Sequence, residues 1–131
     1  MARKLQLSLA CGDYESVRPL KFGLVEPEGI ELNILNIESR ERHWRMGRNQ
    51  EFDICEFNYT SHAIAIDQGR PYIGLPVFLH RRFRHGFIFI NTDKGIETPM
   101  DLIGKRVGGT NFAPASSVWI RGILEDDYRV S

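Results

Sequence analysis

The stretch LQLSLACGDY, residues 5–14, decides the fold class of this chain. Residues 5–10 alternate as Leu, Gln, Leu, Ser, Leu and Ala, a pattern that predicts a β-strand. Gly12 then begins a loop, and the polar Asp13 and Tyr14 follow it directly. The sequence therefore predicts a strand that opens into a polar loop, where a small ligand could bind.

Strand and helix patterns alternate along the rest of the chain. Further strands are predicted over residues 30–37, 52–57, 72–78, 87–90 and 105–108. Helices are predicted over residues 15–24, with an interruption near Pro19, over 39–48 and 98–102 with Ser39 and Thr98 as caps, over 61–66, and after Pro114. This alternation predicts an α/β fold with a mainly parallel sheet, in which ligands gather at the carboxyl ends of strands.

Composition limits the kinds of partner. The chain has 131 residues, enough for one domain with a core, and is 42% hydrophobic, which is ordinary for a globular protein. Lysine plus arginine and aspartate plus glutamate each total 17, so the formal charge is zero. We therefore expect no nucleic-acid partner, although Trp44, Arg45 and Arg48 interleave an aromatic ring with arginines.

The main concentration of positive charge lies in LHRRFRHGFIFIN, residues 79–91. Three arginines and two histidines occupy residues 80–85, and the apolar run 87–90 follows. Arginine suits planar carboxylates because its fork offers paired donors in a fixed geometry. The stretch predicts an anion site at the mouth of a buried strand; the alternative is a solvated basic turn before a strand.

The remaining motifs point to a cytoplasmic, metal-free protein. The apolar run after the basic start is too short for a signal peptide, and no stretch could span a membrane. Cys11 and Cys55 are expected to be free buried thiols, with a disulfide as the alternative. His43 and His62 lie in predicted helices as surface or packing residues, and no histidine pair has metal-ligand spacing, so we expect no metal.

Several strings together carry a family resemblance. They are LSLACGDY (7–14), PEGIELN (27–33), WRMGRNQEFDICEFN (44–58), IGLPVF (73–78), RRFRHGFIFINTDKGI (81–96), DLIGKRVG (101–108) and SSVWIRGILEDDY (116–128). The chain resembles the 4,5-dihydroxyphthalate decarboxylase family, which is similar in fold to type 2 periplasmic solute-binding proteins. DLIGKRVG indicates only the fold, whereas ACGDY, FRHGFIFINTD and VWIRGIL are more specific to the decarboxylase-like branch.

The resemblance implies a two-lobed protein with a ligand in the cleft. Residues 1–98 would form lobe one, and residues 99–131 would begin lobe two with its first strand and helix. Members of the family are more than twice as long, so we expect most of lobe two to be missing here. The apolar face of the last helix, around Trp119, would then lose its partner, which predicts self-association into a homo-oligomer.

Site residues are transferred from the family pattern position by position. The resemblance implies substrate-binding roles for Gly12, Asp13, Asn58, Arg81, Arg82, Arg84, Thr110 and Asn111. Arg82 and Arg84 would clamp the carboxylates of the substrate, while His85 and Glu56 would be the two acid/base candidates, without a cofactor. The alternatives are that Glu56 points to solvent and that His85 only hydrogen-bonds a carbonyl.

The expected function is decarboxylation of an aromatic dicarboxylate. The resemblance implies conversion of 4,5-dihydroxyphthalate to 3,4-dihydroxybenzoate and CO2 by a carboxy-lyase. Two alternatives stay open, a solute-binding protein that captures such an acid for transport and an inactive fragment. The missing export signal favours the enzyme, whereas the shared fold is compatible with either, because function resides in the site.

Overall fold

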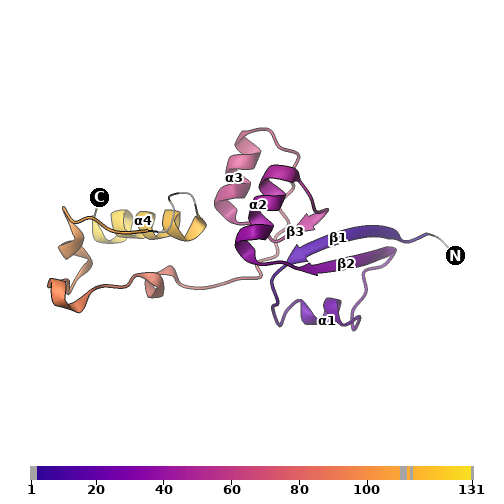
Figure 1. Ribbon diagram of the computed structural model, residues 1–131, viewed down its shortest axis with the longest axis horizontal. Helices are drawn as coiled ribbons and strands as arrows, with labels where there is room; N and C mark the ends of the chain where they lie inside the picture. The colour runs from indigo at the N-terminus through magenta and orange to yellow at the C-terminus, as the bar shows by residue number, and fades with distance from the viewer. Residues whose placement is uncertain (1–2, 110–111, 113, 131) are drawn as a thin grey trace. The chain divides into compact units, whose positions relative to one another are not determined.

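A computed structural model describes residues 3–109, 112 and 114–130. The chain forms two compact units, Met1–Leu79 and His80–Ser131. The first unit holds the sheet and three helices, and the second holds short 3-10 helices and one long helix (Figure 1). Each unit is described by itself below.

A three-stranded parallel sheet forms the centre of the first unit. Its strands are β1 (Leu5–Cys11), β2 (Ile30–Asn36) and β3 (Ile54–Cys55), in the order β2-β1-β3. The full length of β1 pairs with β2, from Leu5 opposite Ile30 to Cys11 opposite Asn36. The predicted α/β class with a parallel sheet is confirmed, and the end of β1 is the best-buried part of the described chain, because Ala10 and Cys11 are 0% and 1% exposed.

The third strand is shorter than predicted. Only Ile54 and Cys55 pair with β1, although Glu56 N still donates to Ala10 O at 2.8 Å. At the start of this strand the Asp53 carboxylate replaces backbone pairing, since it accepts from both N and Oγ of Ser8 at 2.8 and 2.7 Å.

Three helices complete the first unit, and their caps differ from the predictions. Pro19 lies in the first turn of α1 (Arg18–Lys21), where a missing N–H is tolerated, so it begins the helix instead of interrupting it. Glu38, not Ser39, caps α2 (Ser39–Asn49) by accepting from Arg40 N and Glu41 N. Asn58 caps α3 (Tyr59–Asp67), which therefore begins before the predicted start at residue 61.

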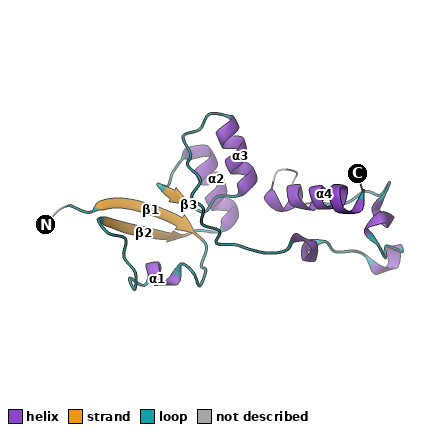
Figure 2. Ribbon diagram, turned by 180° about the vertical axis from the view of Figure 1, so that it is seen from behind, coloured by secondary structure: helices purple, strands orange, loops and turns teal. Residues whose placement is uncertain are grey.

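The helices cover both faces of the sheet. Figure 2 shows α1 on one side of β1 and β2, with α2 and α3 together on the other side. Crossovers between parallel strands are right-handed, so crossovers that run in opposite directions along a sheet place their helices on opposite faces. Here the crossover from β1 to β2 runs one way, and the crossover from β2 to β3 runs back past β1. The N-termini of α2 and α3 thus lie near the carboxyl edge of the sheet.

The second unit contains helices, whereas three of the predicted strands are absent from the described part of the chain. It contains η1 (Arg84–Phe87), η2 (Thr92–Lys94), η3 (Pro99–Leu102) and α4 (Ala115–Tyr128). The predicted strand over 87–90 is wrong, because Phe87 ends a 3-10 turn and Phe89 is 88% exposed. The predicted strands over 72–78 and 105–108 are also absent from the described chain. An apolar run forms a strand only where a neighbouring strand accepts its hydrogen bonds.

The predicted start of η3 and the last predicted helix are confirmed. Thr98 N and Oγ1 donate to the Asp101 carboxylate at 2.8 and 3.0 Å, and Pro99 opens the short helix η3. On α4 Leu124 is buried, whereas Trp119 is 57% exposed. The face around Trp119 is therefore only partly covered by the described residues.

Both cysteines are free thiols, as predicted, but only Cys11 is fully buried, whereas Cys55 is half-buried. No helix within the described residues is both long and apolar enough to cross a membrane.

Candidate active site

The candidate site lies where the strands β1 and β3 end. The connection after β1 leads to β2 on one side of β1, and the connection after β2 leads to β3 on the other side. The carboxyl ends of β1 and β3 therefore lie at the point where the strand order reverses. Parallel α/β sheets bind ligands at such a point. Gly12, Asp13 and Tyr14 follow β1 here, and Glu56 and Asn58 follow β3.

The Glu56 carboxylate is the centre of this site. Its Oε2 accepts hydrogen bonds from Gly12 N at 3.0 Å and from Arg42 Nη2 at 2.6 Å. Its Oε1 accepts from the phenol of Tyr14 at 2.7 Å. The Glu56 side chain is 17% exposed, so the alternative in which it points to solvent is wrong.

Arg42 supplies the positive charge that compensates this buried carboxylate. It is 1% exposed and lies on the face of α2 that packs against the sheet. Besides the ion pair, its Nε donates to Glu56 O at 3.1 Å and its Nη1 donates to Ile37 O at 2.5 Å. A buried guanidinium is tolerated only with such full pairing, and here the pairing joins α2 to the ends of β2 and β3.

Tyr14 and Gly12 are fitted to each other. A Cβ atom added to Gly12 would lie 2.8 Å from Cε2 of the Tyr14 ring, closer than non-bonded carbon atoms approach. Burial, followed by the hydrogen bond to Glu56, raises the pKa of Tyr14 to about 12, so its phenol stays protonated at neutral pH. Glycine at position 12 therefore makes room for the ring that closes the Glu56 network.

The two thiols near the site are not poised as nucleophiles. Burial and the Glu56 charge raise the pKa of Cys11, and burial raises the pKa of Cys55 to about 12. Both therefore stay protonated at neutral pH, whereas thiol nucleophiles react as thiolates.

Asp13 and Asn58 have local partners. Asp13 accepts from Lys21 Nζ at 3.0 Å, and this contact lowers the pKa of the Asp13 carboxyl. The side chain of Asn58 accepts from Ser61 N at 2.8 Å and donates to Ser61 Oγ at 2.7 Å, which caps α3. Both residues lie beside the carboxyl edge, but these hydrogen bonds stabilise the local structure.

The predicted basic cluster belongs to the second unit. Arg81 and Arg82 are exposed, whereas Arg84 is half-buried with its guanidinium 5.2 Å from the centre of the Phe87 ring. His85 makes an edge contact with Tyr128 of α4, with 6.4 Å between ring centres. Arg84 and His85 thus share one 3-10 turn. Thr110 and Asn111 lie outside the described residues.

The family follows from comparison with known proteins. The family model described as NMT1/THI5 like matches residues 23–128. The chain belongs to the NMT1/THI5-like family. The periplasmic-binding-like fold expected from the sequence is thereby confirmed, since it agrees with the mixed α/β unit and its parallel sheet.

Two curated relatives support the finer resemblance. The chain is 39% identical over 128 residues to the 4,5-dihydroxyphthalate decarboxylase of Comamonas testosteroni and 40% identical over 126 residues to that of Pseudomonas putida. These matches cover 97% and 95% of the chain but 39% and 49% of the relatives. The similarity to these decarboxylases is confirmed, and the chain spans half or less of the length of either relative.

Sequence reasoning placed Glu56 at the site but missed its main partner in this NMT1/THI5-like chain. Arg42 lies on a helix rich in arginine, and nothing in the spacing separates it from the exposed Arg40. An apolar residue one turn later does not separate them either, because Met46 follows Arg42 and Trp44 follows Arg40 at the same spacing. For Tyr14 the sequence predicts only a position in the polar loop after the first strand.

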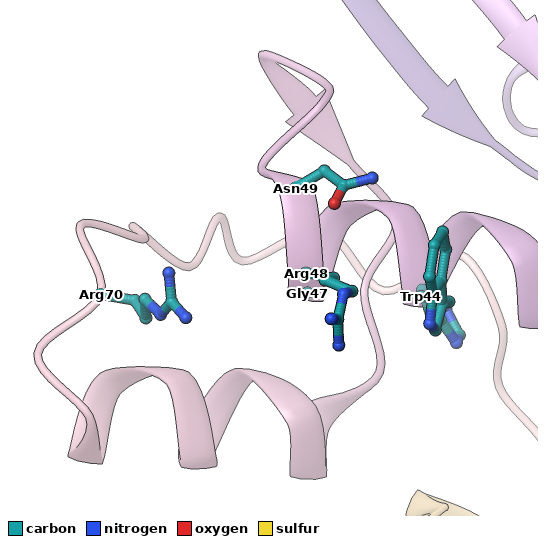
Figure 3. Close-up of a pocket in the computed structure, with 6 residues that line it drawn as sticks. Trp44, Gly47, Arg48, Asn49 and Arg70 are labelled. Carbon is teal, nitrogen blue, oxygen red and sulfur yellow. The ribbon is translucent and has the colours of Figure 1, made fainter.

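The first unit also carries an open groove away from the carboxyl edge. It lies beside the C-terminal half of α2 and the loop after α3, has a volume of about 660 Å³ and includes Arg48 and Arg70 in its lining (Figure 3). His43 contributes to the same lining, and its Nε2 is buried with no hydrogen-bond partner among the described residues. Burial lowers the pKa of His43, so the imidazole is neutral at neutral pH and packs edge-on against Phe57.

Metal-ligating side chains are not clustered in the described part of the chain. Within residues 3–109, 112 and 114–130, no group of three or more histidine, cysteine, aspartate or glutamate side chains could hold a metal ion.

Proposed function

We propose that this protein removes one carboxylate from an aromatic dicarboxylate, converting 4,5-dihydroxyphthalate to 3,4-dihydroxybenzoate and CO2. The observation that carries the proposal is the 39% and 40% identity to two proteins named 4,5-dihydroxyphthalate decarboxylase, over nearly the whole of this chain. The carboxylate network at the end of β1 and β3 supports it, because it offers a carboxylate oxygen at the position where α/β sheets bind ligands.

The chemistry requires a base and an acid at opposite ends of the ring. Removing the proton from the hydroxyl para to one carboxylate pushes electron density to the carbon that carries this carboxylate. That carbon takes a proton, the bond to the carboxylate then breaks, and its electron pair returns to the ring as CO2 leaves. The net change replaces CO2 by a proton, so no oxidant, reductant or cofactor is needed.

The proposed roles of the residues follow this scheme. Glu56 accepts the hydroxyl proton, and His85 supplies the proton to the ring carbon. Arg82 and Arg84 bind the two carboxylates, because guanidinium groups pair with carboxylates in two parallel hydrogen bonds. The remaining proposed substrate contacts are Gly12, Asp13, Asn58, Arg81, Thr110 and Asn111.

A product assay tests the proposal. The chain is incubated with 4,5-dihydroxyphthalate, and the mixture is analysed by chromatography. We expect 3,4-dihydroxybenzoate from the wild type. Replacing His85 by glutamine should abolish this product while ligand affinity changes by less than about twofold. Equal loss of product and binding would make His85 a binding residue.

The second candidate is a solute-binding protein that captures such an acid. Membership of the NMT1/THI5-like family is consistent with it, since the same fold serves capture as well as catalysis. Tight binding of 4,5-dihydroxyphthalate with no product would support capture and contradict decarboxylation.

A further inference from the structure

The two oxygens of the Glu56 carboxylate are unequal. Among the described residues, Oε2 accepts two hydrogen bonds, from Arg42 and Gly12, whereas Oε1 accepts one, from Tyr14. A carboxylate oxygen offers about two lone-pair positions, so Oε2 is filled. A further donor, such as the hydroxyl of a ligand, would therefore meet Glu56 at Oε1.

Arg42 determines this difference. Its three nitrogens each donate to a different acceptor, namely the Glu56 carbonyl, the Ile37 carbonyl and Glu56 Oε2. The two carbonyls belong to the backbone at the ends of β3 and β2, so they hold the guanidinium plane still. The rotation of the Glu56 carboxylate is then set by the remaining nitrogen, Nη2.

We propose that Arg42 is a positioning residue that fixes the Glu56 carboxylate with Oε1 turned toward a ligand hydroxyl. The inference rests on the proposed role of Glu56 at the carboxyl edge of the sheet. Arg42 acts through Glu56 and does not touch the ligand, because it is 1% exposed. The Glu56 carboxylate consequently recognises a hydroxyl group of the ligand and not the carboxylates of the ligand.

Lysine cannot take over this role. Its ammonium is a point charge on a flexible stem, whereas the three hydrogen bonds of Arg42 leave from three positions of one rigid plane. Arg42→Lys thus keeps the charge next to Glu56 but releases the carboxylate to rotate. Arg45 provides the matched control, since it lies on the same helix and pairs with Glu41 and Glu51 at the surface.

The test compares two ligands that share their carboxylates. Phthalate lacks the hydroxyls of 4,5-dihydroxyphthalate, so the ratio of the two affinities reports recognition of the hydroxyls alone. We measure both dissociation constants by calorimetry for the wild type, Arg42→Lys and Arg45→Lys, after checking by circular dichroism that each variant is folded. Arg42→Gln is the second variant if Arg42→Lys does not fold.

The ratio of the affinities for 4,5-dihydroxyphthalate and phthalate should change in Arg42→Lys but not in Arg45→Lys. The wild type and Arg45→Lys should prefer the dihydroxy acid. In Arg42→Lys the preference should fall by roughly tenfold, the size expected for one hydrogen bond to a charged group, while the affinity for phthalate stays within about twofold. A purely structural role would instead weaken both ligands equally.

Three results would overturn the inference. The first is an unchanged ratio in Arg42→Lys, and the second is a wild type without a preference for the dihydroxy acid, including one that binds neither ligand. The third is failure of both Arg42 variants to fold. Turnover is scored separately, because a chain that shows the predicted ratios but releases no product contradicts decarboxylation and leaves the role of Arg42 in place.

Discussion

At the scale of single residues, the Glu56 carboxylate brings together groups from distant parts of the sequence. Arg42 is 14 positions away and Tyr14 is 42 positions away, yet both bind it at less than 3 Å. The sequence predicts Glu56 near the end of a strand over residues 52–57, and in the structure Glu56 directly follows the shorter strand β3. The partners of Glu56 could not be predicted, because an ion pair depends on distances in space that spacing along a helix does not contain.

Gly12 provides a test at this scale. Gly12→Ala should lower the free energy of unfolding by about 1–3 kcal/mol, because the new methyl group displaces the Tyr14 ring from Glu56. The effect should largely disappear when Tyr14 is alanine, since the obstructing ring is then gone. Urea denaturation of the two single variants and the double variant measures this coupling.

The control for this prediction is Gly86→Ala. Nothing lies within 4 Å of a Cβ atom at Gly86, so its free energy of unfolding should stay within about 0.5 kcal/mol of the wild type. An equal cost of Gly12→Ala in the presence and absence of the Tyr14 ring would show that the ring is not the reason for this glycine.

At the scale of elements, caps and strand partners decide where the predicted patterns become structure. Asn58 begins α3 earlier than the apolar pattern suggests, because its side chain accepts from Ser61 N. Strand β1 forms as predicted, since it has a neighbour on each side. The run over 87–90 has a similar apolar character but no strand neighbour among the described residues, and it does not form a strand.

The Asn58 cap of α3 should contribute to the stability of the chain. Asn58→Ala should destabilise the chain by about 1 kcal/mol, because it removes the acceptor for the first turn of the helix. Asn58→Asp keeps an acceptor oxygen and should retain most of the stability. Thermal unfolding followed by circular dichroism compares the three proteins.

The same pair of variants separates capping from ligand binding. If Asn58 also contacts the ligand through its amide, Asn58→Asp should weaken binding of 4,5-dihydroxyphthalate although the helix stays capped. Unchanged binding in Asn58→Asp would restrict Asn58 to its structural role.

At the scale of the whole molecule, stability should depend on alkaline pH. The pKa values of Tyr14 and Cys55 are both raised to about 12, from ordinary values of 10.0 and 9.0. A folded state that holds these protons more tightly than the unfolded state is fully stabilised below pH 9 and loses that stability as pH rises toward 12. We therefore expect the free energy of unfolding to fall between pH 9 and 12.

Two substitutions assign this loss. Tyr14→Phe removes the phenol and Cys55→Ser removes the thiol, so the double variant should show a much flatter dependence over the same pH range. Urea denaturation at a series of pH values measures it. A double variant with the wild-type slope would assign the alkaline loss to other groups.

The sequence alone determined the strands β1 and β2 of the first unit and the membership of the chain in a family. Alternating side chains specify β1 and β2, because strand side chains point to opposite faces in turn, and the polar residues after them specify which edge carries the site. Only the tertiary structure decided that Arg42 and Tyr14 complete that site, and that the run over 87–90 is not a strand. The physical reason is the same in each case, because buried charges and backbone hydrogen bonds are satisfied by partners that lie close in space and far apart in sequence.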